Sequence, residues 1–255
     1  MLNRIEHDSG ILELNMARAP VNALNLELLT ALKEAVEAAP SQGAQALVLS
    51  GSPNVFSAGL DLIWLLQQDE ATLRKCWETF FGCCRAFATS PLISVAAITG
   101  HSPAGGAVIA IHCDYRVMAK SGDKPFTLGL NEVQVGLIVP EAIQYTLQRL
   151  VGMRVAERLC VAGKMVSSEE AVAIGMVDEL ADADQVVARS VQWLRGQLAL
   201  PGYAMRETRR MARADLVEAI TDPSKMDISR FIGVWNREDT QAALRATVAR
   251  FTGKK

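Results

Sequence analysis

The sequence predicts an α/β fold that continues into a helical C-terminal part. Short apolar runs bounded by turn residues recur along the chain and are typical of buried strands. Amphipathic stretches, with apolar residues three or four positions apart, separate these runs and indicate helices. Beyond Asp182 only the helical pattern continues, with breaks near Pro201 and Pro223. We therefore expect an α/β core over residues 1–195 and a helical region over residues 196–255.

The N-terminal elements follow from local signals. Polar and apolar residues alternate on both sides of Asp8-Ser9-Gly10, which predicts a β-hairpin. Asn25 is a suitable N-cap, because its side chain can accept from the first free backbone N–H groups of a helix. Four aromatic residues, Trp77, Phe80, Phe81 and Phe87, predict either core packing or the lining of an apolar cavity. The expected elements are a hairpin over 3–6 and 11–15, a strand over 46–50, and helices over 25–38 and 69–88.

In the second half of the chain, strand patterns and helix patterns again alternate before the sequence becomes helical throughout. Ser167 and Glu170 have the S-x-x-E spacing of a capping box, with Gly175 as the residue that ends the helix. The expected strands lie at 93–98, 115–119, 125–128 and 176–180, and the expected helices at 141–150, 154–162 and 167–174.

Composition limits the classes of function. The chain has 255 residues, is 50% hydrophobic and has a net charge of −2, so a sizeable core is expected and nucleic acid is not indicated as a partner. A basic cluster at Arg206, Arg209, Arg210 and Arg213 is more typical of a solvated helix face than of a phosphate site. No leader and no membrane span are recognisable, so a cytoplasmic protein is expected.

Cysteine and histidine spacing gives no sign of a metal centre. The five cysteines include no CxxC pair, and the three histidines show no ligand spacing with them. We expect reduced, buried thiols and no bound metal.

A glycine-rich turn follows the strand at 93–98 and leads into the apolar segment 107–111. A strand that enters a helix through glycines leaves backbone N–H groups free at the helix N-terminus, where they favour an anion or a developing oxyanion. A purely structural tight turn explains Gly100–Gly106 equally well at this point. Residues 55–62 are a second place where backbone N–H groups can face a ligand, although Asp61 also fits a helix-capping role.

Glu132 stands alone among apolar and amide residues. A carboxylate in such surroundings is expected to have a raised pKa, which suits a general base near neutral pH. The alternative is a glutamate on a surface loop.

Together these segments resemble the crotonase (enoyl-CoA hydratase/isomerase) superfamily. The likeness rests on the order of four motifs: residues 56–62, residues 98–106, Cys113-Asp114-Tyr115-Arg116 and Gly129-Leu130-Asn131-Glu132. Within the superfamily these patterns are most similar to Δ3-Δ2-enoyl-CoA isomerases of the dodecenoyl-CoA isomerase type. The resemblance implies a spiral of ββα units, a C-terminal helical part used in trimerisation, and a homotrimer or dimer of trimers.

The resemblance also implies the site. An acyl-CoA thioester would be the substrate, with no separate cofactor. Its oxygen would lie between the N–H groups of Leu60 and Gly105, and Glu132 would be the catalytic carboxylate. The residues expected to bind substrate are Ala58, Gly59, Leu60, Asp61, Leu62, Gly105 and Asn131.

One departure favours an isomerase over a hydratase. Hydratases of this kind carry a second glutamate where this chain has Val108. One carboxylate is enough to move a proton from C2 to C4, whereas adding water needs two proton-handling groups. The alternatives are a hydratase or another acyl-CoA enzyme, a serine hydrolase built around Ser102, and a non-catalytic acyl-CoA-binding protein. Ser102 precedes a proline and lacks the G-x-S-x-G elbow, which argues against the hydrolase.

Overall fold

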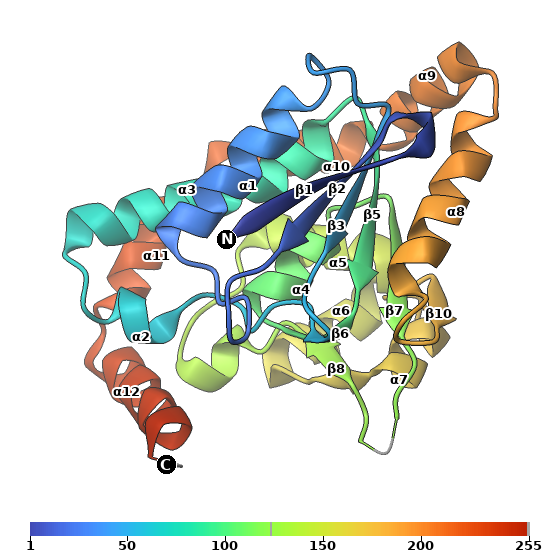
Figure 1. The fold of residues 1–255 in the computed structure, drawn as a ribbon. Coiled ribbons are helices and arrows are strands. Elements are labelled where there is room, and N and C mark those ends of the chain that lie inside the picture. Colours follow the sequence, from blue (N-terminus) through green and yellow to red (C-terminus); the bar gives the residue numbers. More distant parts are fainter. Residues whose placement is uncertain (123, 254–255) are drawn as a thin grey trace.

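The larger of two β-sheets lies at the centre of the fold. The computed structural model describes residues 1–122 and 124–253, and it carries this sheet in the order β1-β2-β3-β5-β7-β10 (Figure 1). The predicted hairpin β1–β2 is antiparallel, and the other neighbouring strands pair in parallel. The strands are β1 (Leu2–His7), β2 (Ile11–Met16), β3 (Ala46–Ser50), β5 (Ile93–Ile98), β7 (Tyr115–Ala119) and β10 (Glu179–Ala181). The last strand is shorter than the expected 176–180.

Helices cover both faces of this sheet, which explains why its central strands read as continuous apolar runs. The helices α1 and α3 lie on one face and α8 on the other (Figure 1). Leu47 and Leu49 of β3 belong to the core cluster that includes α1 and α3, whereas Val48 and Val95 belong to the cluster that includes α8. Asn25 caps α1 by accepting from the Leu28 N–H at 3.0 Å, as the sequence predicts. The three helices are α1 (Leu26–Ala38), α3 (Glu70–Thr89) and α8 (Val186–Leu198).

A smaller sheet lies beside the first, and most of it is missing from the sequence-based expectations. Its order is β4-β6-β8-β9, with β4 (Asn54–Val55), β6 (Gly100–Pro103), β8 (Thr127–Gly129) and β9 (Val166–Ser167). The expected path from strand 93–98 through a turn to a helix is therefore wrong in one respect, because β6 intervenes. Gly100 permits this pairing, since a Cβ there would lie 2.0 Å from the Asn54 carbonyl carbon.

The two sheets create a repeated ββα unit. Each unit has one strand in each sheet and then a helix, as in β3-β4-α2 (Leu62–Leu65) and β5-β6-α4 (Gly105–Ala110). The predicted α/β spiral is confirmed. Three further helices complete the middle of the chain: α5 (Glu141–Val151), α6 (Met153–Ala162) and α7 (Ser168–Ala173). Ser167 caps α7 by accepting from the Glu170 N–H at 3.1 Å, as its spacing predicts.

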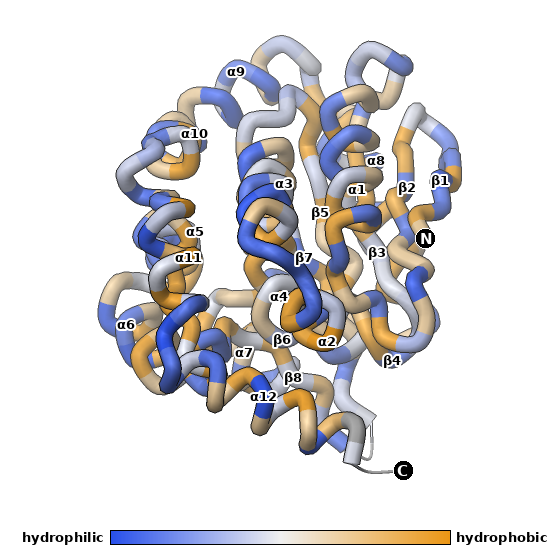
Figure 2. The backbone as a smooth tube through the Cα atoms, turned by 90° about the vertical axis from the view of Figure 1, so that its left-hand side faces the viewer, coloured by the Kyte–Doolittle hydropathy of each residue, from blue (hydrophilic) through white to orange (hydrophobic). Residues whose placement is uncertain are grey.

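The C-terminal part is helical, as expected, and folds back over the core. It consists of α9 (Gly202–Ala212), α10 (Ala214–Thr221), α11 (Ile228–Trp235) and α12 (Glu238–Thr252). Phe231 of α11 packs on Trp77 of α3, with ring centroids 4.4 Å apart. Blue and orange segments alternate along α1 and α12 in Figure 2, which is the pattern of helices with one buried face. The domain division at residue 195 stays a prediction, and α8 runs across it.

Two general features concern the chain as a whole. All five cysteines are free and buried, which agrees with the expected reduced thiols. Within residues 1–122 and 124–253, we find no helix with the length and hydropathy needed to span a bilayer.

Candidate active site

An apolar cavity of about 130 Å³ lies between the core and the C-terminal helices. Its walls come from distant parts of the chain: the loop before α2, the helices α3 and α4, the segment 131–140, and α11 and α12. Of the lining residues that the structure describes, Glu132 is the only titratable one. The full lining is Ala58, Leu60, Leu62, Trp77, Phe80, Phe81, Pro103, Ala104, Gly105, Val108, Asn131, Glu132, Val135, Leu137, Ile138, Val139, Pro140, Ile143, Phe231, Thr247 and Phe251.

The glycine turn places the N-terminus of α4 on this cavity. Ala104 has φ +45° and ψ −122°, a strained conformation for a residue with a side chain. It turns the chain sharply from β6 into α4. Gly105 is the first helical residue, and its N–H donates to no acceptor in the described part of the chain. The turn is therefore more than a structural connection, because it presents a free donor beside an apolar cavity.

The loop before α2 places a second free donor next to the first. Gly59 has φ +80°, and a Cβ there would lie 3.1 Å from Pro103 O and 3.2 Å from Gly105 N. The two loops can approach this closely only because residue 59 is glycine. The Leu60 N–H, like that of Gly105, has no acceptor within the described residues. A Cβ on Gly105 would lie 3.4 Å from Leu60 N, so the two residues that carry the free donors lie close together, and both line the cavity.

Glu132 opens a short 3₁₀ helix, η2 (Glu132–Val135), at the cavity wall. The residue as a whole is partly exposed, yet its Oε2 is buried and has no hydrogen-bond partner among the described residues. Burial raises the pKa of Glu132 to about 7. The neighbouring Asn131 Oδ1 is also buried without a partner in the described chain. The raised pKa predicted from the sequence is confirmed, and the alternative of a glutamate on a surface loop is wrong.

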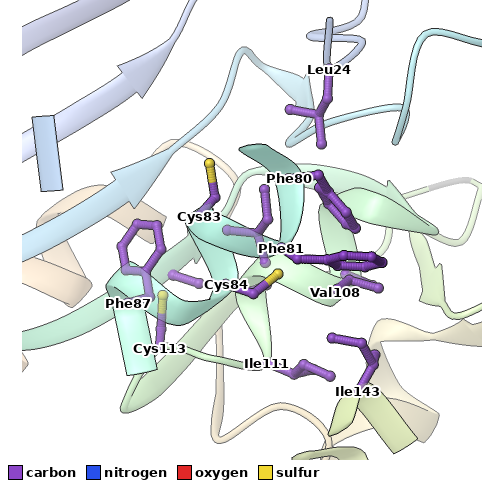
Figure 3. Packing of buried hydrophobic residues seen from close by; sticks show 14 of the residues in the cluster. Leu24, Phe80, Phe81, Cys83, Cys84, Phe87, Val108, Ile111, Cys113 and Ile143 are labelled. Carbon is purple, nitrogen blue, oxygen red and sulfur yellow. The ribbon is translucent and has the colours of Figure 1, made fainter. Parts of the chain in front are cut away.

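Val108 makes the wall near these groups apolar. It is 2% exposed and lies one turn into α4. Figure 3 shows Val108 and Ile143 beside the rings of Phe80 and Phe81, with Leu24 above Phe80. The sequence leaves the aromatic residues of α3 open between core packing and cavity lining. Trp77, Phe80 and Phe81 do both, whereas Phe87 belongs to the core alone.

Asp61 stabilises the loop before α2 and does not line the cavity. Its Oδ1 accepts from the Trp64 N–H at 3.0 Å and caps α2, and its Oδ2 pairs with Arg18 at 2.7 Å. The helix-capping role considered from the sequence is thus confirmed. Gly59 and Asp61 do not line the cavity, whereas Ala58, Leu60, Leu62, Gly105 and Asn131 do.

The hydrolase alternative finds no support in the geometry. Ser102 is fully buried, and no group in the described chain accepts from or donates to its Oγ. The adjacent His101 is exposed, and its Nδ1 accepts from the Thr127 N–H at 3.2 Å. A nucleophilic serine needs a base within hydrogen-bond reach and an open path to substrate. Ser102 has neither.

Three arginines of the basic cluster, two on α9 and one just before α10, form ion pairs within the protein. Arg209 and Arg213 both bind the partly buried carboxylate of Asp114 at 2.8 Å, and Arg210 pairs with Glu207. The expected solvated helix face is therefore only partly right, because two of the arginines anchor the C-terminal helices. A search for three or more clustered His, Cys, Asp or Glu side chains finds no candidate metal site in residues 1–122 and 124–253.

Sequence reasoning missed the contribution of the C-terminal helices to the cavity. Phe231, Thr247 and Phe251 lie more than ninety positions beyond Glu132 but line the same space. Their only sequence signal is the apolar face of a helix, which does not say what that face covers.

Comparisons with known proteins agree with this architecture. Residues 6–254 match the enoyl-CoA hydratase/isomerase family. The chain is 31% identical to mouse mitochondrial enoyl-CoA delta isomerase 1, over all of this chain and 88% of the mouse protein. It is also 31% identical to a probable enoyl-CoA hydratase of Mycobacterium avium, over 78% of this chain and 76% of that protein. The crystal structure of human mitochondrial delta3-delta2-enoyl-CoA isomerase superposes with a TM-score of 0.92 at 29% identity, covering 100% of this chain and 99% of the human one.

Proposed function

Because the chain belongs to the enoyl-CoA hydratase/isomerase family of the crotonase superfamily, we propose that it is a Δ3-Δ2-enoyl-CoA isomerase of fatty acid β-oxidation. One observation carries the proposal: the cavity has a single carboxylate, that of Glu132, among the lining residues that the structure describes. Two free backbone N–H groups lie at the same cavity, and Val108 occupies the position where hydratases of this family carry a second glutamate.

The reaction needs one base and one site for a negative oxygen. Glu132 removes a proton from C2 of a 3-enoyl-CoA, and the electron pair moves onto the thioester oxygen as an enolate. The N–H groups of Leu60 and Gly105 donate to that oxygen. Glu132 then returns the proton at C4, so that the double bond moves from C3–C4 to C2–C3. Loss of one donor from such a site typically raises the barrier by about 2.7–4 kcal/mol.

The surroundings of Glu132 suit this exchange. A base whose pKa of about 7 lies close to neutral pH can both accept and return a proton. The apolar wall at Val108 keeps water away from the enolate and contributes to the burial that raises the pKa. Asn131, whose Oδ1 has no partner in the described chain, is available to contact the substrate or orient it beside Glu132.

The loop Ala58–Leu62 would run along the coenzyme A part of the substrate. In this arrangement Gly59 and Asp61 shape the loop, while its cavity-lining residues contact the thioester end. The assembly as a homotrimer or dimer of trimers, the cytoplasmic location and the lack of a separate cofactor remain predictions.

The test is a product analysis with 3-enoyl-CoAs of several chain lengths. The wild type should form trans-2-enoyl-CoA, and Glu132→Gln should lower turnover by about 10²–10⁴-fold while retaining acyl-CoA binding. Glu141→Gln is the matched control, because Glu141 is an exposed glutamate at the start of α5 beside the same segment. Its turnover should equal that of the wild type.

Two results would contradict the proposal. Unchanged turnover in Glu132→Gln would remove the catalytic role of this carboxylate. Substantial water addition to trans-2-enoyl-CoA by the wild type would assign the chain to the hydratases instead.

A further inference from the structure

The side chain of Ser57 forms hydrogen bonds to two backbone segments, the one that contains Asn22 and the one that leads to Leu60. Ser57 is fully buried and does not line the cavity. Its Oγ donates to the backbone oxygen of Asn22 at 2.8 Å and accepts from the Gly59 N–H at 3.1 Å. A hydroxyl has only one hydrogen, so the direction of both bonds is fixed. Ser57 therefore ties the Ala58–Gly59 peptide to the loop that contains Asn22.

The next peptide unit carries the free donor of Leu60. The Gly59 carbonyl in this unit accepts from the Leu24 N–H at 2.8 Å. Because a trans peptide points its C=O and N–H in opposite directions, this bond turns the Leu60 N–H away from Leu24. Gly59 lies between the two tethered peptides, and glycine by itself allows wide rotation of both. The orientation of the Leu60 N–H thus depends on the hydrogen bonds that hold these two peptides. Leu24 holds the Gly59–Leu60 peptide through its backbone, and the Ser57 side chain holds the Ala58–Gly59 peptide before it.

We propose that Ser57 is a positioning residue, which holds the Leu60 N–H in the direction that stabilises the enolate. This inference rests on the function proposed above. Ser57 acts through Gly59 and does not touch the substrate. Its removal would also leave the Gly59 N–H and the Asn22 carbonyl buried without a partner, so some loss of stability accompanies the functional effect.

Ser102 offers a matched control for that loss. Ser57 and Ser102 are both fully buried, and they flank the same glycine. A Cβ on Gly106 would lie 3.0 Å from Ser102 Oγ and 3.0 Å from Ser57 Cβ. The Oγ of Ser102, in contrast, has no partner in the part of the chain that is described. Ser102→Ala therefore deletes the same atom from the same neighbourhood without breaking a hydrogen bond.

The experiment measures kcat and KM with a 3-enoyl-CoA, and the Kd of a saturated acyl-CoA of the same length, for the full chain. Ser57→Ala should lower kcat by about tenfold to a hundredfold, because misplacing a group that acts in the transition state reduces the rate rather than substrate binding. KM and the Kd should change by less than about twofold. The pH at which activity rises should stay near that of the wild type, because Glu132 is untouched. Ser102→Ala should match the wild type in every measurement.

The outcomes separate this inference from the proposed function. An inactive wild type would refute the function itself. If the wild type is active, a kcat for Ser57→Ala within twofold of it would overturn the positioning role. An equal loss in Ser102→Ala would do the same, as would a rise in KM at constant kcat. Should Ser57→Ala fail to fold, Ser57→Cys retains a weak donor and acceptor and is expected to give an intermediate kcat; wild-type kcat in that variant would contradict the proposal.

Discussion

At Glu132, one carboxylate oxygen, Oε2, is buried and has no hydrogen-bond partner in the described structure. Burial disfavours the charged form, which is why the pKa rises from its ordinary 4.5 to about 7. Such a group is protonated at mildly acid pH, unlike most glutamates.

The first prediction is the pH dependence of isomerisation. Only the carboxylate form can remove the C2 proton, so kcat/KM should rise with pH, reach half its maximum near pH 7, and level off above it. Val108→Thr keeps the shape of the side chain and adds a hydroxyl to the cavity wall, which should move the midpoint to lower pH. Initial rates in buffers of constant ionic strength measure both curves. A wild-type midpoint near pH 4.5 would mean that the cavity is not dry around the carboxylate.

At the residue scale, the sequence predicts which side chain can act as the base, but it does not predict what surrounds that side chain in the fold. Glu132 is recognisable because only apolar and amide residues stand near it in the chain. Its burial depends on side chains such as Phe231 and Phe251, whose positions follow from the packing of remote helices. Ser57 carries no sequence signal for positioning, because its two partners are backbone atoms.

At the scale of elements, Gly59 joins the loop 58–62 to the turn that begins α4. Gly59→Ala introduces two costs: a positive φ for a residue with a side chain, and contacts of 3.1–3.2 Å with Pro103, Ala104 and Gly105. Gly43→Ala is the control that isolates the backbone cost, because Gly43 has φ +90° and nothing lies within 4 Å of the added Cβ. We expect both variants to lose about 1–2 kcal/mol of stability from the backbone term, but only Gly59→Ala to lose turnover. Denaturant unfolding and steady-state rates test this; full activity in Gly59→Ala would show that the two loops need not touch.

The C-terminal helices depend on Asp114 for their attachment to the core. This partly buried carboxylate binds Arg209 of α9, Arg213 and the Ser94 N–H. Asp114→Asn leaves two guanidinium groups partly buried without their counter-charge, so the free energy of unfolding should fall by about 3–5 kcal/mol. Arg210→Ala, which breaks an exposed pair on the same helix, should cost less than about 1 kcal/mol. Chemical denaturation compares the two, and equal small losses would contradict the anchoring role.

The same carboxylate gives a pH dependence of stability. Burial by itself raises the pKa of Asp114, but Arg213, Arg209 and the hydrogen bonds it accepts outweigh burial and hold the pKa below the ordinary 3.8. A depressed pKa in the folded state means that the unfolded chain binds the proton more readily. This contribution is therefore complete above the unfolded pKa and is lost as the pH falls through the folded one. Between pH 4 and pH 2, wild-type stability should fall more steeply than that of Asp114→Asn; parallel curves would contradict this.

Long elements are predictable from the sequence because their periodicity extends over many residues. The helices α1 and α3 and the strands β3 and β5 agree with their expected ranges within a residue or two. The strands β4 and β9 have two residues each, which is too short for any alternation to show. β6 was hidden for another reason: its residues, Gly100–Pro103, have the composition of a turn, and they pair only because Gly100 lets the Asn54 backbone come close.

At the scale of the molecule, the cavity is a product of chain folding that no local pattern contains. The order of motifs along the sequence predicts the family and the ββα spiral. It does not predict that α12 returns to the site, where the Thr240 hydroxyl donates to the Gly136 carbonyl at 3.0 Å beside η2. That contact joins residues more than a hundred positions apart. It needs the hydroxyl of Thr240 and a glycine at position 136, where a Cβ would lie 2.9 Å from Thr240 Cα.

The last prediction concerns the trimer that the family resemblance implies. No residue of α9 is buried within its own chain. Two of its large apolar side chains are strongly exposed: Tyr203 is 79% and Met211 62% exposed. Apolar side chains on a helix with so little internal packing are typical of an interface. We expect a particle of three times the 27.6 kDa chain mass in sedimentation equilibrium, or six times for a dimer of trimers, and dissociation to single chains in Tyr203→Glu/Met211→Glu. The far-ultraviolet circular dichroism should not change, because neither side chain packs in the core. A wild type at single-chain mass would contradict the assembly; a variant that stays trimeric would place the interface elsewhere than α9.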